Sequence, residues 1–127
     1  MTDCPCISII IPTYQREEVL CSTIADVLRQ DYPDFEVIVV DQTHDHQPET
    51  QSYLETTAQS GKIEYFQLPW ASLPGARNYA IERAKGDIFL FLDDDVELPA
   101  GCLAAHAKGF AGRPEVGAIA GRVFDRM

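Results

Sequence analysis

Two short runs of β-branched residues limit the possible folds of this chain more than any other feature of its sequence. They are CISIIIP, residues 6–12, and FEVIVVD, residues 35–41. Neither run alternates apolar with polar residues, as a strand with one solvated face would. Each run therefore predicts a strand that is buried on both faces. Strands of this kind belong to parallel sheets whose two faces are covered by helices.

Segments with helical periodicity separate the apolar runs. Residues 17–30 carry apolar side chains at helical spacing, with two glutamates at the start and Arg29 near the end, as the helix dipole favours. Strict alternation of strand and helix predicts an α/β domain, residues 1–127, with an open and mostly parallel sheet and helices on both faces. The other expected elements are a helix at 49–60, a strand at 62–68, a helix at 76–86 that stops at Gly86, a strand at 87–93, a helix at 99–110 and a strand at 116–124.

The composition excludes some classes of partner. The chain has 127 residues, 46% of them hydrophobic, and a formal net charge of -10. Such a charge disfavours bulk nucleic-acid binding and binding to anionic membranes through a basic patch. It leaves room for a local anion site built from backbone amides and one or two arginines. The four cysteines form no C-x-x-C pair and are expected to be reduced. We find neither a bilayer-spanning apolar run nor a signal-peptide pattern, so we expect a cytoplasmic protein.

Three consecutive carboxylates, Asp93, Asp94 and Asp95, follow the apolar run at residues 88–92. At a buried strand end their mutual repulsion is poorly screened, so a compensating cation is expected there. Asp93 and Asp95 are two residues apart and point to the same side of an extended chain, so both can reach one ion. Hard oxygen ligands suit Mg²⁺ or Mn²⁺, held jointly with phosphate oxygens.

Other polar groups follow the other predicted strands, and the carboxyl ends of parallel strands meet at one edge. Residues 12–14 offer a rigid turn, a hydroxyl and an aromatic face for a base. Asp41 ends the second strand and can accept hydrogen bonds from a ribose or base. Gly75 lets the backbone approach a ligand, and Arg77 adds a charged fork for phosphate. The combination suits a nucleotide with a diphosphate.

Each of these residues also has a purely structural interpretation. Asp41 can be a turn or helix-cap residue. Arg77 can be a surface or ion-paired arginine, and Tyr14 can cover the edge of the core. Residues 44–46, HDH, look like a metal cluster, but loop histidines without further ligands are expected to be solvated.

Four segments together resemble the family 2 glycosyltransferases, which have the GT-A fold. They are ISIIIPTYQR, EVIVVDQTHD, PGARNYAIERAKGDIFLFLDDD and VGAIAGRVF, and they occur in the family's order and spacing over nearly the whole chain. The resemblance implies a nucleotide-diphospho-sugar donor, most commonly a UDP-sugar, and a Mn²⁺ or Mg²⁺ ion held by a D-x-D motif. The implied donor-binding residues are Pro12, Thr13, Tyr14, Asp41, Arg77, Asp93 and Asp94, and the implied metal ligands are Asp93 and Asp95.

Two features depart from the family pattern. The loop after the second strand is commonly DDGSTD, whereas this chain has the shorter DQTHD, which leaves the contacts of Gln42 and Thr43 open. Family members also continue well beyond residue 127, and the continuation supplies the acceptor site and the general base that deprotonates the acceptor hydroxyl. We therefore expect the donor-binding half of an inverting transferase, with a saccharide or lipid-linked acceptor, in the cytoplasm or at the inner face of the membrane. The alternative is a nucleotide-binding module without transferase activity.

Aspartate-based phosphoryl chemistry fits less well. The phosphatase motif D-x-D-x-[TV] would begin at Asp93, but its fifth position is Glu97. A receiver domain would require an acidic pair after the first strand, where PTYQR stands. If a missing half normally completes the sheet, an open strand edge or apolar surface predicts self-association.

Overall fold

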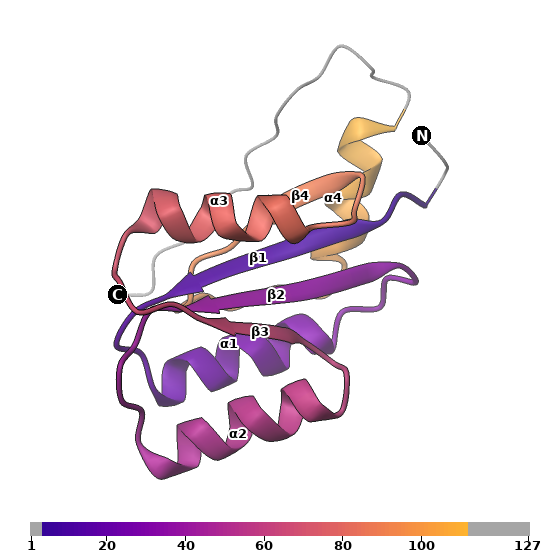
Figure 1. Cartoon of the computed structure of the whole chain (residues 1–127). Coiled ribbons are helices and arrows are strands. Elements are labelled where there is room, and N and C mark those ends of the chain that lie inside the picture. Colours follow the sequence, from indigo (N-terminus) through magenta and orange to yellow (C-terminus); the bar gives the residue numbers. More distant parts are fainter. Residues whose placement is uncertain (1–3, 112–127) are drawn as a thin grey trace, which may run out of the picture.

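The computed structural model describes residues 4–111 as a parallel sheet between two helical layers (Figure 1). The sheet order is β3-β2-β1-β4. The predicted strand at 116–124 lies outside the described residues. The elements, in chain order, are β1 (Ile7–Thr13), α1 (Glu18–Leu28), β2 (Phe35–Asp41), α2 (Pro48–Gln59), β3 (Glu64–Gln67), α3 (Leu73–Arg83), β4 (Ile88–Phe91) and α4 (Cys102–Phe110).

The two central strands are buried on both faces, as their sequences predict. Every residue of β1 is buried, and β1 pairs in parallel with β2 from Ile7 opposite Phe35 to Thr13 opposite Asp41. Alternation divides the side chains of β1 between two cores, with Ile9 on one side of the sheet and Ile10 on the other. The two strands end level with each other, so the residues that follow them leave the same edge.

Helices cover both faces of the sheet, which confirms the predicted α/β architecture. The apolar stripe of α1 packs on one face, where Leu54 of α2 and Leu103 of α4 join the same core. The opposite face is covered by α3, which packs through Ala76 and Ala80. Figure 1 shows α1 and α2 on one side of the sheet and α3 on the other. Small alanines let α3 lie close to β1 and β2.

The third helix begins earlier than its sequence predicts, at Leu73. Ser72 is its N-cap, and the Ser72 hydroxyl accepts a hydrogen bond of 3.2 Å from the backbone N–H of Gly75. Pro74 is tolerated in the first turn because the N–H that it lacks would have no helical partner. Gly75 is packed beneath Trp70, since a Cβ there would lie 2.5 Å from the indole ring.

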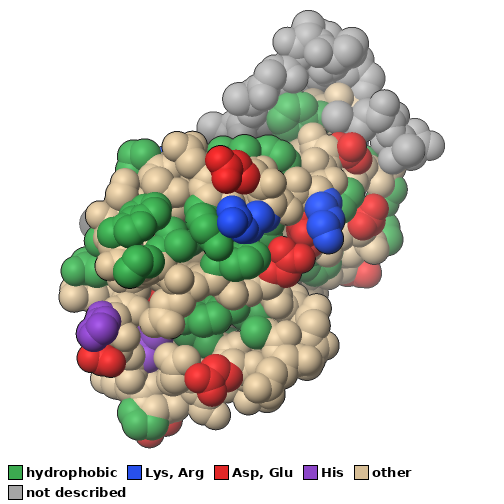
Figure 2. Space-filling model, in the orientation of Figure 1, with side chains coloured by type: hydrophobic (Ala, Val, Ile, Leu, Met, Phe, Trp, Pro, Cys, Tyr) green, Lys and Arg blue, Asp and Glu red, His purple; other side chains and the backbone are tan. Residues whose placement is uncertain are grey.

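The strand before the three carboxylates is not buried on both faces, contrary to the prediction. Within residues 4–111, β4 pairs only with β1 and forms an edge of the sheet. Phe89 and Phe91 are 39% and 43% exposed because α3 packs over β1 and β2 rather than over β4. Figure 2 shows apolar side chains (green) gathered beside basic ones (blue) on one face of the molecule.

Candidate functional site

The strand order reverses at β1, and this reversal places the candidate site. The chain runs from β1 outward to β2 and β3 and then returns to β4 on the other side of β1. In open α/β sheets, ligands bind beyond the carboxyl ends of the strands at such a point. A cavity of about 480 Å³ lies there. It is lined by Pro12, Thr13, Tyr14, Arg16, Gln42, Ala71, Ser72, Leu73, Asp93, Asp94 and Asp95.

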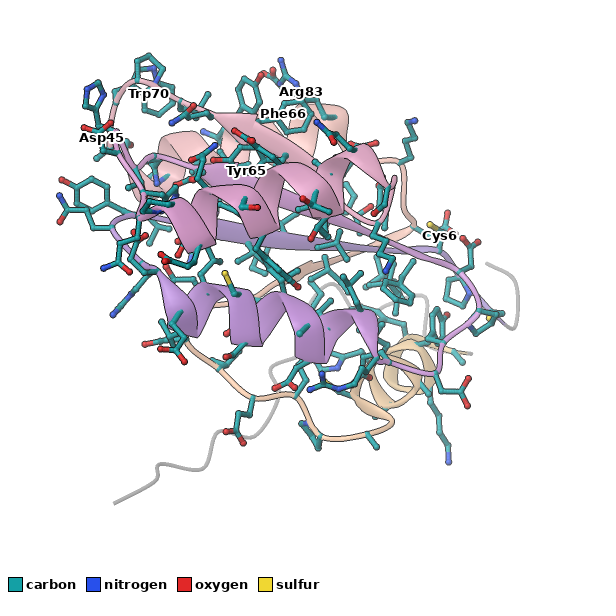
Figure 3. The ribbon with its side chains drawn as sticks, turned by 90° about the horizontal axis from the view of Figure 1, so that it is seen from below. Cys6, Asp45, Tyr65, Phe66, Trp70 and Arg83 are labelled. Atoms are coloured by element: carbon teal, nitrogen blue, oxygen red, sulfur yellow. The ribbon has the colours of Figure 1, made fainter. Side chains whose placement is uncertain are left out.

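The cavity is built by four segments that are far apart in the sequence. They follow β1, β2, β3 and β4, so every wall comes from the carboxyl edge of the sheet. Figure 3 shows Asp45 and Trp70 at one end of the molecule and Cys6 at the opposite end. The expected meeting of polar segments at one edge is therefore present in the structure.

Asp94 fastens the acidic segment to the sheet. The Thr13 hydroxyl donates a hydrogen bond of 2.7 Å to Asp94 Oδ2. The Thr23 hydroxyl on α1 lies 3.1 Å from the carbonyl oxygen of Asp94. The side chain of Asp94 is only 13% exposed, whereas that of Asp95 is 46% exposed. Asp94 is thus anchored by the chain itself, and its neighbours remain open to a ligand.

Arg16 supplies the positive charge that the acidic segment needs in the absence of a ligand. Its Nε lies 3.3 Å from Asp94 Oδ1, and one terminal nitrogen lies 3.6 Å from Asp95 Oδ2. Arg16 is 47% exposed, so these ion pairs contribute only about 0.2–1 kcal/mol each. Sequence reasoning missed Arg16, although a basic residue three positions after a strand end, opposite an acidic run, was the available signal.

The remaining carboxylates fit a shared metal site rather than a closed one. Within residues 4–111, no three histidine, cysteine or carboxylate side chains converge as a preformed metal cluster. Asp93 and Asp95 are exposed and line the same cavity. Mg²⁺ is commonly held by one or two carboxylates together with substrate phosphates and water. The donor set here matches that arrangement.

Asp41 is not among the residues that line the cavity, and its predicted place beside a nucleotide stays a prediction. Its side chain is fully buried, and Oδ2 lies 2.5 Å from His46 Nε2 and 2.5 Å from the Tyr65 hydroxyl. Oδ1 accepts a hydrogen bond of 3.0 Å from the backbone N–H of Thr43. The chain's own donors hold the carboxylate inside, and Gln42, the next residue, lines the cavity instead.

Gln42 is a cavity residue that sequence reasoning left without a role. Its Oε1 accepts a 2.5 Å hydrogen bond from the backbone N–H of Ser72, the residue that caps α3. The side-chain amide therefore joins the end of β2 to the start of α3. The position of Gln42 directly after a buried strand could have indicated a site residue. The adjacent carboxylate of Asp41 was preferred because a charged group binds a ribose or base more strongly.

Arg77 lies near the end of β4 but is not among the residues that line the cavity. Its guanidinium carbon is 5.7 Å from the centre of the Phe91 ring, a cation–π distance. Its Nε is buried and has no hydrogen-bond partner among the described residues. An unpaired buried donor of this kind is suited to an anion that is not part of the chain.

Two neighbouring loop histidines have opposite surroundings. His44 and Asp45 are 98% and 90% exposed, as expected for a solvated loop. The side chain of His46 is fully buried between Asp41 and Glu17, so the expectation of solvation is wrong for this residue. Its burial follows from contacts with a helix start and a strand end, which the loop sequence alone does not reveal.

The fold and the cavity define an α/β domain with an acidic crevice at the switch point of a parallel sheet. The Glycosyl transferase family 2 profile matches residues 8–127, and the chain belongs to that family. A β-1,3-glucosyltransferase of Campylobacter jejuni that acts on GalNAc(5)-diNAcBac-PP-undecaprenol is 33% identical over 103 residues, which are 79% of this chain and 33% of that protein.

Two solved structures share the architecture. The mannosyltransferase PcManGT of Pyrobaculum calidifontis, in complex with GDP-Man and Mn²⁺, has a TM-score of 0.72 and 27% identity over 86% of this chain and 33% of its own. Staphylococcus aureus TarS in complex with UDP-GlcNAc has a TM-score of 0.71 and 29% identity, over 82% and 30% of the respective chains. This chain spans only 9% to 35% of the first curated relatives that it matches.

Proposed function

We propose that this chain is the donor-binding part of a metal-dependent, inverting glycosyltransferase. The observation that carries the proposal is the cavity at the switch point, where the segment after β1 meets Asp93 and Asp95. An exposed aromatic side chain, Tyr14, lies in the same cavity as the two carboxylates. An aromatic face and a pair of exposed carboxylates suit a nucleoside and a diphosphate-bound cation, respectively.

The nature of the donor is supported by the solved relatives. Their titles name UDP-GlcNAc, UDP and GDP-Man as bound molecules. We therefore propose a nucleoside-diphospho-sugar, with uridine as the first base to test and guanosine or thymidine as the alternatives. The acceptor is a saccharide or a lipid-linked saccharide, in keeping with the undecaprenol-linked substrate that the Campylobacter enzyme's name states.

Thr13, Arg16 and Arg77 have different roles in the proposed donor site. Thr13 fixes the acidic segment through Asp94, so that Asp93 and Asp95 face the cavity from a constrained position. Arg16 neutralises Asp95 now and would release it if a cation carried by the ligand were to pair with the Asp95 carboxylate instead. The Nε of Arg77, which has no partner within residues 4–111, is placed to favour a negatively charged ligand close by.

A bound Mn²⁺ or Mg²⁺ would offset charge on the departing diphosphate, as a Lewis acid. Asp93 and Asp95 would hold it from the protein side. In this proposal, the base that deprotonates the acceptor lies in the part of the relatives that extends beyond this chain. Nucleotide binding, rather than sugar transfer, is therefore the first property that we expect to measure for residues 1–127.

Calorimetric titration with UDP, with and without Mn²⁺, tests this proposal. We expect binding that requires the metal and is lost in Asp95→Ala. Asp45→Ala is the matched control. Asp45 is an exposed carboxylate at the same edge of the sheet, but it does not line the cavity. The single tryptophan, Trp70, precedes the cavity residues Ala71 and Ser72, so its fluorescence gives a second readout. Failure of UDP, GDP and dTDP alike to bind would contradict the proposal.

A nucleotide-binding module without transferase activity is the second candidate. This chain spans only 9% to 35% of relatives whose names describe whole proteins, so their activity is not carried over to residues 1–127 alone. Donor hydrolysis and transfer assays on the purified chain separate the two. Transfer by residues 1–127 alone would exclude the module, whereas binding without turnover would support it.

A further inference from the structure

A buried cluster behind the cavity joins His46 to two carboxylates. His46 Nε2 lies 2.5 Å from Asp41 Oδ2, and His46 Nδ1 lies 2.8 Å from Glu17 Oε2. The side chains of His46 and Asp41 are both fully buried, and that of Glu17 is 25% exposed. The Tyr65 hydroxyl donates to the same Asp41 oxygen at 2.5 Å.

The hydrogen-bond partners of His46 indicate the charge of its ring. A neutral imidazole donates from one nitrogen only, whereas an imidazolium donates from both. Ionised carboxylates accept and cannot donate. Both ring nitrogens of His46 face a carboxylate, so when both carboxylates are ionised only the imidazolium satisfies both contacts. The positive charge also offsets the repulsion between Asp41 and Glu17 inside the protein.

The cluster fastens both ends of the loop from residue 42 to residue 47. At the first end, Asp41 Oδ1 accepts the backbone N–H of Thr43 at 3.0 Å. At the other end, Glu17 Oε1 accepts the backbone N–H of Gln47 at 2.7 Å, just before α2. Gln42, between Asp41 and Thr43, lines the cavity.

We propose that His46, as a buried imidazolium, is the positioning residue that holds the loop at 42–47 so that Gln42 faces the candidate donor cavity. His46 does not touch the cavity and acts through Asp41 and Glu17. The consequence for donor affinity rests on the proposed function. The charge state of His46 and the order of the loop are independent of the proposed function.

The surroundings of His46 set the direction of its titration. Burial by itself would lower the pKa of His46, but hydrogen bonds and charge from Asp41 and Glu17 outweigh burial and raise it. Burial would raise the pKa of Glu17, yet the Gln47 amide, His46 and Thr50 lower it. Burial and Asp41 raise the pKa of Tyr65, which therefore stays a donor at neutral pH.

The sign of the pH dependence follows from these directions. The folded pKa of His46 is raised, so its contribution to stability is complete below its unfolded pKa of about 6.5 and is lost as pH rises through the folded value. The folded pKa of Glu17 is lowered, so its contribution is lost only as pH falls through that lowered value. The loop is thus held most firmly between the ordinary pKa of a glutamate, about 4.5, and that of a histidine, about 6.5, and it loosens as pH rises through the folded pKa of His46.

NMR titration of the three histidines gives the first test. We expect His46 to titrate above the ordinary histidine value of about 6.5, and Glu17→Gln to move the His46 midpoint downward. A His46 midpoint at or below about 6.5 would overturn the proposal.

Amide hydrogen exchange in His46→Gln, compared with His44→Gln at one pH near 7, gives the second test. We expect the Gln42 and Thr43 amides to exchange about tenfold faster in His46→Gln only. UDP affinity with Mg²⁺ should fall in the same variant and, in the unsubstituted chain, should weaken as pH rises past the His46 midpoint. Equal exchange in both variants would overturn the positioning role. Loss of UDP binding in every variant, with exchange as expected, would instead count against the proposed function alone.

Discussion

Replacing Gly86 by alanine tests how the connection between α3 and β4 is fastened to the sheet. A Cβ at Gly86 would lie 2.5 Å from Ser8 Oγ, 2.7 Å from the Ser8 backbone nitrogen and 2.9 Å from the carbonyl oxygen of Cys6. All three distances are below 3.0 Å, a separation that real Cβ atoms essentially never show. Two of the three atoms belong to backbone at the start of β1, so a side-chain rotation cannot relieve the overlap.

The cost combines three effects. Overpacking of this kind costs about 1–3 kcal/mol. The backbone N–H of Gly86 also donates to Ser8 Oγ at 2.8 Å, and losing that bond costs about 1 kcal/mol. Reduced freedom of the unfolded chain returns about 0.4–1 kcal/mol. We expect Gly86→Ala to lower the free energy of unfolding by about 2–3 kcal/mol, which in a domain of this size lowers Tm by roughly 10 °C.

Urea unfolding followed by far-UV circular dichroism measures this loss, with the slope m showing whether the transition stays comparable. The double variant Ser8→Ala with Gly86→Ala separates the causes when it is compared with Ser8→Ala, because the Ser8 hydroxyl also donates to Glu36 at 2.5 Å. Removing the Ser8 hydroxyl relieves the shortest overlap but leaves the two backbone overlaps, so we expect only partial recovery. A loss below about 0.5 kcal/mol in Gly86→Ala, or full recovery in the double variant, would refute the steric argument.

Two further predictions concern a thiol and a strand edge. Burial, followed by the hydrogen bond and charge of Asp34 and the charges of Glu36 and Asp87, raises the pKa of Cys6 to about 11. At pH 8, iodoacetamide should therefore alkylate Cys6 about a hundredfold more slowly than free cysteine, and peptide mass spectrometry showing a rate near that of free cysteine would contradict this. Phe89 and Phe91 are exposed on β4, which is an edge strand within residues 4–111, so we predict self-association at high concentration that Phe89→Lys reduces. A clean monomer in sedimentation at several hundred micromolar would count against it.

The sequence alone determines the class of fold and the edge at which the site lies. Unbroken β-branched runs at β1 and β2 require burial on both faces, and helical periodicity between them requires a parallel sheet with covering helices. These patterns are local, so they can be recognised without tertiary contacts. The segment Pro12–Tyr14 and the acidic run Asp93–Asp95 were expected at one edge, and the structure brings both into one cavity.

The tertiary structure alone decides which polar residues face that cavity. Asp41 and Gln42 are adjacent and both polar, but neighbours in an extended chain point to opposite sides, so one enters the interior and the other the cavity. Tyr65 on β3 and His46 in the loop after β2 form hydrogen bonds with Asp41 and hold its side chain in the interior. Glu17, 29 positions before His46, completes the buried cluster. Contacts between residues so far apart in the sequence depend on strand order and on the packing of α1 and α2. They cannot be predicted from the pattern of neighbouring residues.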